Sequence, residues 1–223
     1  MPEALKINIG NNESVTALIY SAEGRKPLKT TVLLGHGAGA NQTSDFMVTF
    51  AAGLAARGAD VATFNFPYME QGRRAPDRND KLEACYRAAI GAIRNHSKRN
   101  RLVIGGKSLG GRIASQVAAG GVDDLAGLLF LGYPLHPPGK PEQLRAEHLA
   151  RIHAPMLFVQ GGRDPFGTPE ELRPVIEKLN SRATLYVVEG GDHSLAVPKK
   201  WPVSQEAVYA AALDEIARWL SRL

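Results

Sequence analysis

Residues 102–112 read Leu-Val-Ile-Gly-Gly-Lys-Ser-Leu-Gly-Gly-Arg, an apolar run that leads into glycines on both sides of a serine. The pentapeptide Gly106-Lys107-Ser108-Leu109-Gly110 has the Gly-x-Ser-x-Gly spacing of a serine held on a sharp turn between a strand and a helix. Small residues are needed two positions before and after the serine, because the turn strains the backbone and brings neighbouring segments into contact. We therefore predict a strand over 102–104 and a helix over 108–119.

A phosphate-binding loop is the alternative interpretation, because it also contains Gly-Lys-Ser. That loop needs a further glycine, separated from Gly106 by four residues, and Arg101 stands there. A Gly-x-Ser-x-Gly pentapeptide also arises by chance in a chain with many glycines. Its place between a predicted strand and a predicted helix is what favours the serine turn.

The composition is that of a folded globular domain. Of the 223 residues, 44% are hydrophobic and 22% are charged, which excludes a disordered, collagen-like or coiled-coil chain. No apolar run approaches the roughly 18–20 residues of a membrane span. Residues 1–223 are therefore predicted to form a single domain with no membrane partner.

The charge and the cysteine content indicate which binding partners and which cellular compartment to expect. Lys and Arg number 27 against 22 Asp and Glu, which gives a net charge of +5. The basic residues are scattered, and no aromatic residues interleave with them, so we expect a solvated basic face and no nucleic-acid partner. The single cysteine, Cys85, is interpreted as helix packing. Without a possible internal disulfide or a leader-like N-terminus, the chain is expected in the cytoplasm.

Short apolar runs alternate with longer helical patterns along most of the chain. The predicted strands cover 5–9, 15–20, 31–34, 61–66, 102–104, 128–132, 155–160 and 184–188. The predicted helices cover 45–57, 80–98, 108–119, 170–179 and 203–221. The turn-forming Gly10-Asn11-Asn12 predicts a hairpin between the first two strands. The fold class is therefore α/β: a mostly parallel eight-stranded sheet with an N-terminal antiparallel hairpin and helices on both faces.

Candidate catalytic residues follow three of these strands. A ligand site in such a sheet lies at the carboxyl ends of the parallel strands, where Ser108, Asp164 and His193 are expected. A serine hydroxyl needs a base to take its proton and an acid to orient that base. Each residue also has a plain interpretation, with Asp164 as a helix cap and His193 as an ordinary loop histidine. Asp192 is an alternative acid.

An acyl-transfer site also needs two backbone N–H groups for the oxyanion. The first is expected from Leu109, the residue after the serine. The second is expected from Ala38 in the loop Gly35-His36-Gly37-Ala38-Gly39, which follows an early predicted strand. A purely structural turn is the alternative for that loop.

The motifs together resemble the α/β-hydrolase superfamily. They are His36-Gly37-Ala38-Gly39, Gly106-Lys107-Ser108-Leu109-Gly110, Gly162-Arg163-Asp164-Pro165-Phe166 and Gly191-Asp192-His193. The order Ser, Asp, His along the chain is also that of this superfamily. Residues 64–74 are similar to a small lid-less branch near the dienelactone-hydrolase-like enzymes, which includes testis-expressed protein thirty. Ser108 stands where dienelactone hydrolase has a cysteine.

Substrate features are predicted from three places. Residues 134–154, where larger relatives insert a lid, are too few for a cap domain, so an open site and a small soluble ester are expected. Arg73 and Arg74, in the loop after the strand over 61–66, are candidates for binding an acidic substrate. Alternatively both are solvated or pair with Glu70 or Asp77. His36 is a further candidate for substrate contact.

The sequence thus predicts a serine hydrolase that cleaves a carboxylic ester or related acyl bond. Ser108, Asp164 and His193 form its expected catalytic triad, and Ala38 and Leu109 its oxyanion hole. No metal spacing is visible, and neither a metal nor another cofactor is expected. Two alternatives stay open: a binding or scaffold module on the same fold, and a peptidase or thioesterase.

Overall fold

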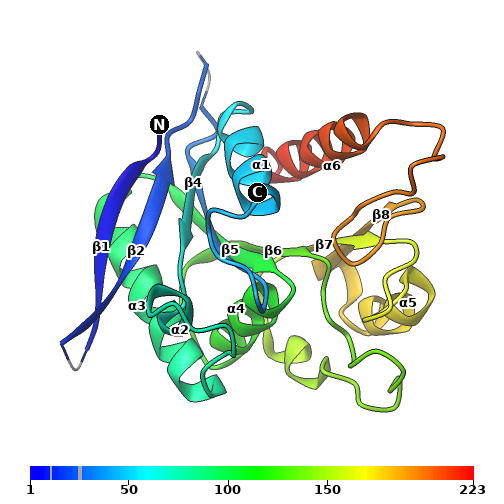
Figure 1. The fold of residues 1–223 in the computed structure, drawn as a ribbon, viewed down its shortest axis with the longest axis horizontal. Helices are drawn as coiled ribbons and strands as arrows, with labels where there is room; N and C mark the ends of the chain where they lie inside the picture. The colour runs from blue at the N-terminus through cyan, green and yellow to red at the C-terminus, as the bar shows by residue number, and fades with distance from the viewer. Residues whose placement is uncertain (11, 25–26) are drawn as a thin grey trace.

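One sheet forms the centre of the molecule, and helices cover both of its faces (Figure 1). The computed structural model describes residues 1–10, 12–24 and 27–223. Within these residues the strands are β1 (Glu3–Gly10), β2 (Glu13–Tyr20), β3 (Thr30–Gly35), β4 (Asp60–Phe64), β5 (Arg101–Lys107), β6 (Leu125–Leu131), β7 (Met156–Gly161) and β8 (Ala183–Val188). The helices are α1 (Asp45–Ala55), α2 (Pro67–Glu70), α3 (Asn79–His96), α4 (Leu109–Ala119), η1 (Glu147–Arg151), α5 (Pro169–Lys178), η2 (Asn180–Arg182) and α6 (Gln205–Leu220).

The strand order is β1-β2-β4-β3-β5-β6-β7-β8. β2 pairs antiparallel with both β1 and β4, and every later pair is parallel. This confirms the predicted fold class, a mostly parallel eight-stranded sheet that begins with an antiparallel hairpin. Gly10 and Asn12 of the predicted hairpin turn both have positive φ, and Asn11 between them lies outside the described residues.

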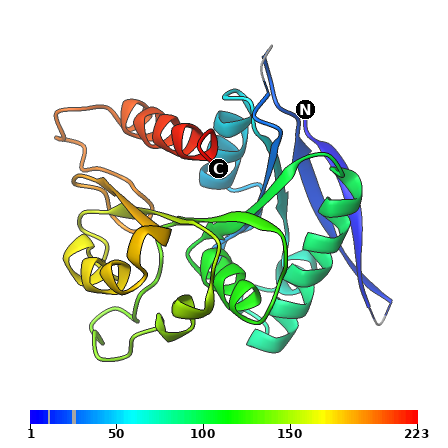
Figure 2. The ribbon, with the colours of Figure 1, turned by 180° about the vertical axis from the view of Figure 1, so that it is seen from behind.

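Two apolar layers hold the helices on the sheet (Figures 1 and 2). α1 and α6 lie on one face, where Phe50 and Leu213 belong to a core cluster with alternate residues of the central strands. α3, α4 and α5 lie on the other face, in a second cluster that includes Cys85 and Leu172. Cys85 is buried there, as its interpretation as a packing residue requires, and burial raises its thiol pKa to about 12.

Several element boundaries differ from the sequence prediction. β4 ends at Phe64 and not at Phe66, because Pro67 begins the short helix α2 and the Phe66 N–H donates to a histidine ring instead of a neighbouring strand. α6 begins at Gln205, where the Ser204 hydroxyl caps the helix by accepting the N–H of Ala207. On the same helix Leu213 is buried, whereas Val208 is only partly buried.

The segment 132–155 between β6 and β7 folds back against the body of the molecule. Leu135 and Leu149 are fully buried in the core cluster on the α4 side. The Tyr133 hydroxyl donates to the Arg145 carbonyl, and Ser115 on α4 shares a 2.7 Å hydrogen bond with His148 on η1. Burial lowers the pKa of His148 to about 4. The two ends of this segment are thus packed into the core, and η1 is tied to α4. In the described parts of the chain, no helix combines the length and apolar character that a membrane span needs.

Three glycines allow β3, β5 and α4 to touch through their backbones. A Cβ on Gly106 would lie 2.2 Å from the Gly35 carbonyl oxygen, and a Cβ on Gly110 would lie 2.1 Å from the same atom. Gly106 also has φ of 151°, which side chains rarely adopt. The outer glycines of the Gly-x-Ser-x-Gly motif are therefore required by backbone contact, and this contact fixes where α4 begins.

Replacing Gly110 with alanine should destabilise the fold, because no flexible side chain is present to move away from the new Cβ. We expect the free energy of unfolding to fall by at least about 2 kcal/mol. Gly91→Ala is the matched control, since Gly91 is also helical but nothing lies within 4 Å of its missing Cβ. This control should gain about 0.5–1 kcal/mol from helix propensity. Urea unfolding of both variants measures the difference in stability. Equal stabilities would show that the close backbone contact at Gly110 does not exclude a side chain.

Candidate active site

Ser108 sits on the sharp turn between β5 and α4. Its φ of 49° and ψ of −111° lie outside the regions that residues with a side chain prefer. The Ser108 N–H donates to the Leu131 carbonyl on β6, and its carbonyl accepts the N–H of Arg112. The backbone is thus held on both sides of the strained residue, while the residue as a whole stays partly exposed.

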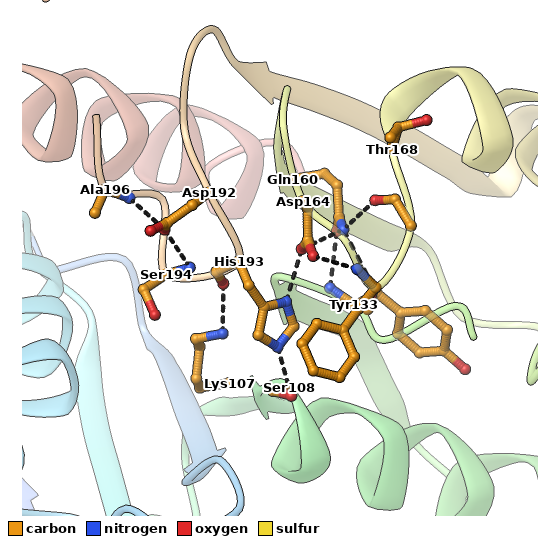
Figure 3. Close-up of polar contacts among 12 residues, drawn as sticks. Lys107, Ser108, Tyr133, Gln160, Asp164, Thr168, Asp192, His193, Ser194 and Ala196 are labelled. Carbon is orange, nitrogen blue, oxygen red and sulfur yellow. Dashed lines mark hydrogen bonds and ion pairs between the residues drawn. The ribbon is translucent and has the colours of Figure 1, made fainter. Parts of the chain in front are cut away.

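His193 and Asp164 complete a line of hydrogen bonds with this serine (Figure 3). His193 Nε2 lies 2.8 Å from Ser108 Oγ, and His193 Nδ1 lies 2.7 Å from Asp164 Oδ2. The serine follows β5, the aspartate follows β7 and the histidine follows β8. The structure therefore brings together all three residues that the sequence analysis placed in a triad.

Asp164 is fully buried and its two carboxylate oxygens are occupied. Oδ1 accepts the N–H of Phe166, and Oδ2 accepts both His193 and the Gln160 side-chain amide at 2.8 Å. The Gln160 amide also bonds to the backbone of Tyr133 and Gly167, so its orientation is fixed. Gln160 was missed in the sequence analysis. The available signal was a polar residue near the end of an otherwise apolar, fully buried strand.

The loop that carries His193 is held by its neighbours. Asp192 Oδ1 accepts the N–H groups of Ser194 and Ala196, which closes a turn around the histidine. Asp192 therefore stabilises the loop and does not bond to the imidazole. Phe166 stacks on the His193 ring, with centroids 4.2 Å apart and planes 29° from parallel. The stacking by Phe166 was also missed.

The two predicted oxyanion donors belong to segments that adjoin the serine. In the described residues, neither the Ala38 N–H nor the Leu109 N–H has a hydrogen-bond acceptor. Leu109 is the first residue of α4, and the partial positive charge of a helix N-terminus favours an anion there. The loop that contains Ala38 lies against the serine, since a Cβ on Gly37 would be 3.6 Å from Ser108 Cβ.

His36, which the sequence analysis gave as a candidate for substrate contact, has no exposed surface. Its side chain is fully buried, with Nε2 accepting the Phe66 N–H at 3.0 Å and Nδ1 2.8 Å from the Gly37 carbonyl oxygen. Burial lowers the His36 pKa to about 4, so the neutral ring ties the loop after β3 to the start of α2. The prediction was wrong because the Phe66 amide, which is distant in sequence, needs a buried acceptor.

Of the two arginines predicted to bind an acidic substrate, Arg73 is paired with other side chains and Arg74 is exposed. Arg73 donates to Asp77 at 2.6 Å and to Gln71, and Arg74 is exposed on the same loop. In the described residues neither one bonds to Ser108, Asp164 or His193. The alternative of ion pairing holds for Arg73, and the structure gives no support for an acidic substrate at this loop.

Nothing in the described ranges 1–10, 12–24 and 27–223 groups three or more His, Cys, Asp or Glu side chains around a potential metal position. The Ser108 hydroxyl, the His193 imidazole and the buried Asp164 carboxyl group lie in one hydrogen-bonded line. Such an arrangement can carry out acyl transfer.

The family comparison agrees with this geometry. Residues 28–221 match the family model described as "Alpha/beta hydrolase domain". The chain belongs to this family. The match extends from just before β3 to the last residues of the chain, so the alpha/beta hydrolase domain includes the elements that carry Ser108, Asp164 and His193.

Solved structures of other alpha/beta hydrolases have the same fold. A lid-less serine hydrolase from Xanthomonas campestris is 18% identical, with a TM-score of 0.72 over 99% of this chain and 92% of that chain. A dienelactone hydrolase from Anabaena variabilis is 16% identical, with a TM-score of 0.75 over 100% and 97%. An esterase from Pyrococcus furiosus is 15% identical, with a TM-score of 0.79 over 100% and 91%. At these identities the likeness establishes the fold.

The buried His36 should make this alpha/beta hydrolase sensitive to acid. Its folded pKa of about 4 is below the ordinary 6.5, so between these values the unfolded chain binds a proton that the folded chain does not. The free energy of unfolding should therefore fall as pH decreases from 6.5 to 4, by up to about 3 kcal/mol from this group.

Urea unfolding at several pH values checks this expectation. His36→Gln should lose less stability than the wild type over the acid range, whereas His96→Gln, at an exposed position near the end of α3, should follow the wild type. Parallel curves for the wild type and His36→Gln would show that His36 is not held neutral.

Proposed function

We propose that this alpha/beta hydrolase cleaves carboxylic esters of small molecules through a covalent acyl-enzyme on Ser108. The observation that carries the proposal is the continuous hydrogen-bonded line from Ser108 through His193 to the buried Asp164. A partly exposed serine at one end of this line and a buried, fully hydrogen-bonded carboxylate at the other are what nucleophilic catalysis requires.

In the acylation step, Ser108 Oγ attacks the ester carbonyl carbon while His193 Nε2 takes the hydroxyl proton. Asp164 accepts the Nδ1–H of the imidazole, which sets the tautomer with a free Nε2 and stabilises the imidazolium that forms. The tetrahedral intermediate collapses when the carbon–oxygen bond to the alcohol breaks. His193 gives its proton to the departing alcohol oxygen, and the acyl group stays on Ser108.

In the deacylation step, water attacks the acyl carbon and His193 takes one of its protons. The intermediate then releases the carboxylic acid, and the proton returns to Ser108 Oγ. Water can reach this point because Ser108 is partly exposed and the His193 side chain is 18% accessible. Each cycle consumes one ester and one water and leaves the enzyme unchanged.

The oxyanion of both intermediates would accept hydrogen bonds from the Ala38 and Leu109 N–H groups. Both groups lack another acceptor in the described structure, so they need not break an existing bond to bind the oxyanion. Donors that are fixed before the reaction stabilise the transition state without reorganisation. The neutral His36 supports this arrangement by holding the Gly37–Ala38 loop in place.

We further propose that residues 1–223 act as one domain without a cap, so that the site opens directly to solvent. The two ends of the segment 132–155 pack into the core, and η1 within it is hydrogen-bonded to α4. An uncovered site gives little apolar burial to a long acyl chain, and this favours short or soluble esters. The buried, unpaired Cys85 suits a reducing compartment, which supports a place in the cytoplasm.

A small fluorophosphonate tests the nucleophile without a choice of substrate. We expect one adduct by intact mass on the wild type and none on Ser108→Ala, with the same loss for hydrolysis of p-nitrophenyl acetate. Circular dichroism should show that the variant is folded. A folded wild type without an adduct would favour the binding-module alternative, and an adduct that persists in Ser108→Ala would exclude Ser108 as the nucleophile.

The proposed role of Asp164 is tested by comparison with Asp192, the residue that precedes His193 in the sequence. Asp164→Asn should lower kcat on the order of 10³- to 10⁴-fold, because the amide stabilises neither the tautomer nor the imidazolium. Asp192→Asn is the matched control and should change kcat less than about threefold, since an amide oxygen can still accept the Ser194 and Ala196 N–H groups. Similar losses of kcat in both variants would contradict the proposal that Asp164 orients His193.

A further inference from the structure

Lys107, the residue before the serine, is a lysine in an unusual place. The residue is only 8% exposed, although lysine is almost never buried without a partner of opposite charge. It lies on the face of the sheet that α1 covers, with its ammonium 5.6 Å from the centre of the Phe46 ring. In the described residues no carboxylate is within ion-pair distance of this ammonium.

The ammonium group makes one specific hydrogen bond. Lys107 Nζ donates to the backbone carbonyl oxygen of His193 at 2.5 Å. Within the described chain this is also the one hydrogen bond that the His193 carbonyl accepts. Figure 3 shows the arrangement: Ser108 contacts the imidazole of His193, while Lys107 reaches the backbone of the same residue from the side.

The lysine stem also contacts the other loops of the site. A Cβ on Gly37 would lie 3.4 Å from Lys107 Cγ, so the stem lies against the loop that carries the proposed oxyanion donor. A Cβ on Gly132, after β6, would lie 3.1 Å from Nζ, so a side chain there would displace the ammonium. Lys107 is therefore enclosed by the loops after β3, β6 and β8.

Stability alone does not account for a charged group at this position. Burial lowers the Lys107 pKa to about 8, against an opposing effect of Asp164 and Asp192, which shows that the ammonium is held at a free-energy cost. A methionine would have a similar length and would fill the space beside Phe46 without that cost. What methionine cannot supply is the hydrogen bond to the His193 carbonyl.

We propose that Lys107 is a positioning residue that holds the backbone of His193, so that the imidazole stays in line between Ser108 and Asp164. This inference rests on the proposed function. Asp192 closes the turn around His193, and Phe166 and Asp164 hold its ring, but the carbonyl of His193 itself is held by Lys107. Because Lys107 and Ser108 are adjacent in the chain, the end of β5 then contacts both the backbone and the imidazole of His193.

The test compares Lys107→Met, which removes the donor, with Lys107→Arg, which keeps one. Lys199→Met is the matched control, because Lys199 is exposed on the same loop as His193. The readouts are the maximal rate (kinact) and the half-saturating concentration (KI) of Ser108 labelling by a small fluorophosphonate, together with Tm. Lys107→Met should lower kinact about 10- to 100-fold, since small displacements of a catalytic group have effects of this size. KI should change less than about threefold, and Tm should not fall.

Partial recovery of kinact in Lys107→Arg, and wild-type behaviour of Lys199→Met, would support positioning by the donor. If Lys107→Met does not fold, Lys107→Gln replaces it, because its shorter amide does not reach the carbonyl and the same loss of kinact is expected. A folded Lys107→Met or Lys107→Gln with kinact within about twofold of the wild type would overturn the inference while leaving the proposed function intact. A wild type that is not labelled on Ser108 would overturn the proposed function, and this inference with it.

Discussion

The contact of Gly35, Gly106 and Gly110 through their backbones is the constraint on which the rest of the site depends. Because the Gly35 carbonyl oxygen lies where a Cβ of either other glycine would be, α4 begins directly above β3 and β5. This approach forces the intervening chain into a turn so tight that Ser108 takes a positive φ. The serine is thereby raised above the strand ends, where groups from other loops can reach it.

Buried polar groups around this turn then determine which loops reach it. The Asp164 carboxylate is fully buried, so its oxygens must be satisfied, and Gln160, Phe166 and His193 supply the hydrogen bonds. These bonds join the loops after β7 and β8. On the other side of Ser108, the buried ring of His36 joins the loop after β3 to α2. The reactive geometry is therefore a consequence of hydrogen-bond satisfaction in a buried environment and not only of the strand order.

The sequence predicted the fold and the grouping of Ser108, Asp164 and His193 because both follow from one-dimensional signals. Apolar runs show where strands end, and parallel strands bring their ends to one edge of the sheet. It did not predict Gln160 or Lys107, because their partners are distant in sequence and depend on the direction of single side chains. The failure for His36 has the same physical origin. The sequence places this histidine in a glycine-rich loop, which indicates that it is free to contact substrate. In the structure its ring is buried, because it accepts the N–H of Phe66, a residue distant in sequence.

Two consecutive residues at the end of β5 contact elements on opposite faces of the sheet. Ser108 begins α4 on one face, and Lys107 packs beside Phe46 of α1 on the other. Both side chains meet His193, one at its ring and one at its carbonyl. Movement of the loop after β8 relative to the sheet must therefore break contacts on both faces together. The position of the His193 ring relative to Ser108 is therefore determined by contacts of this loop with the end of a central strand.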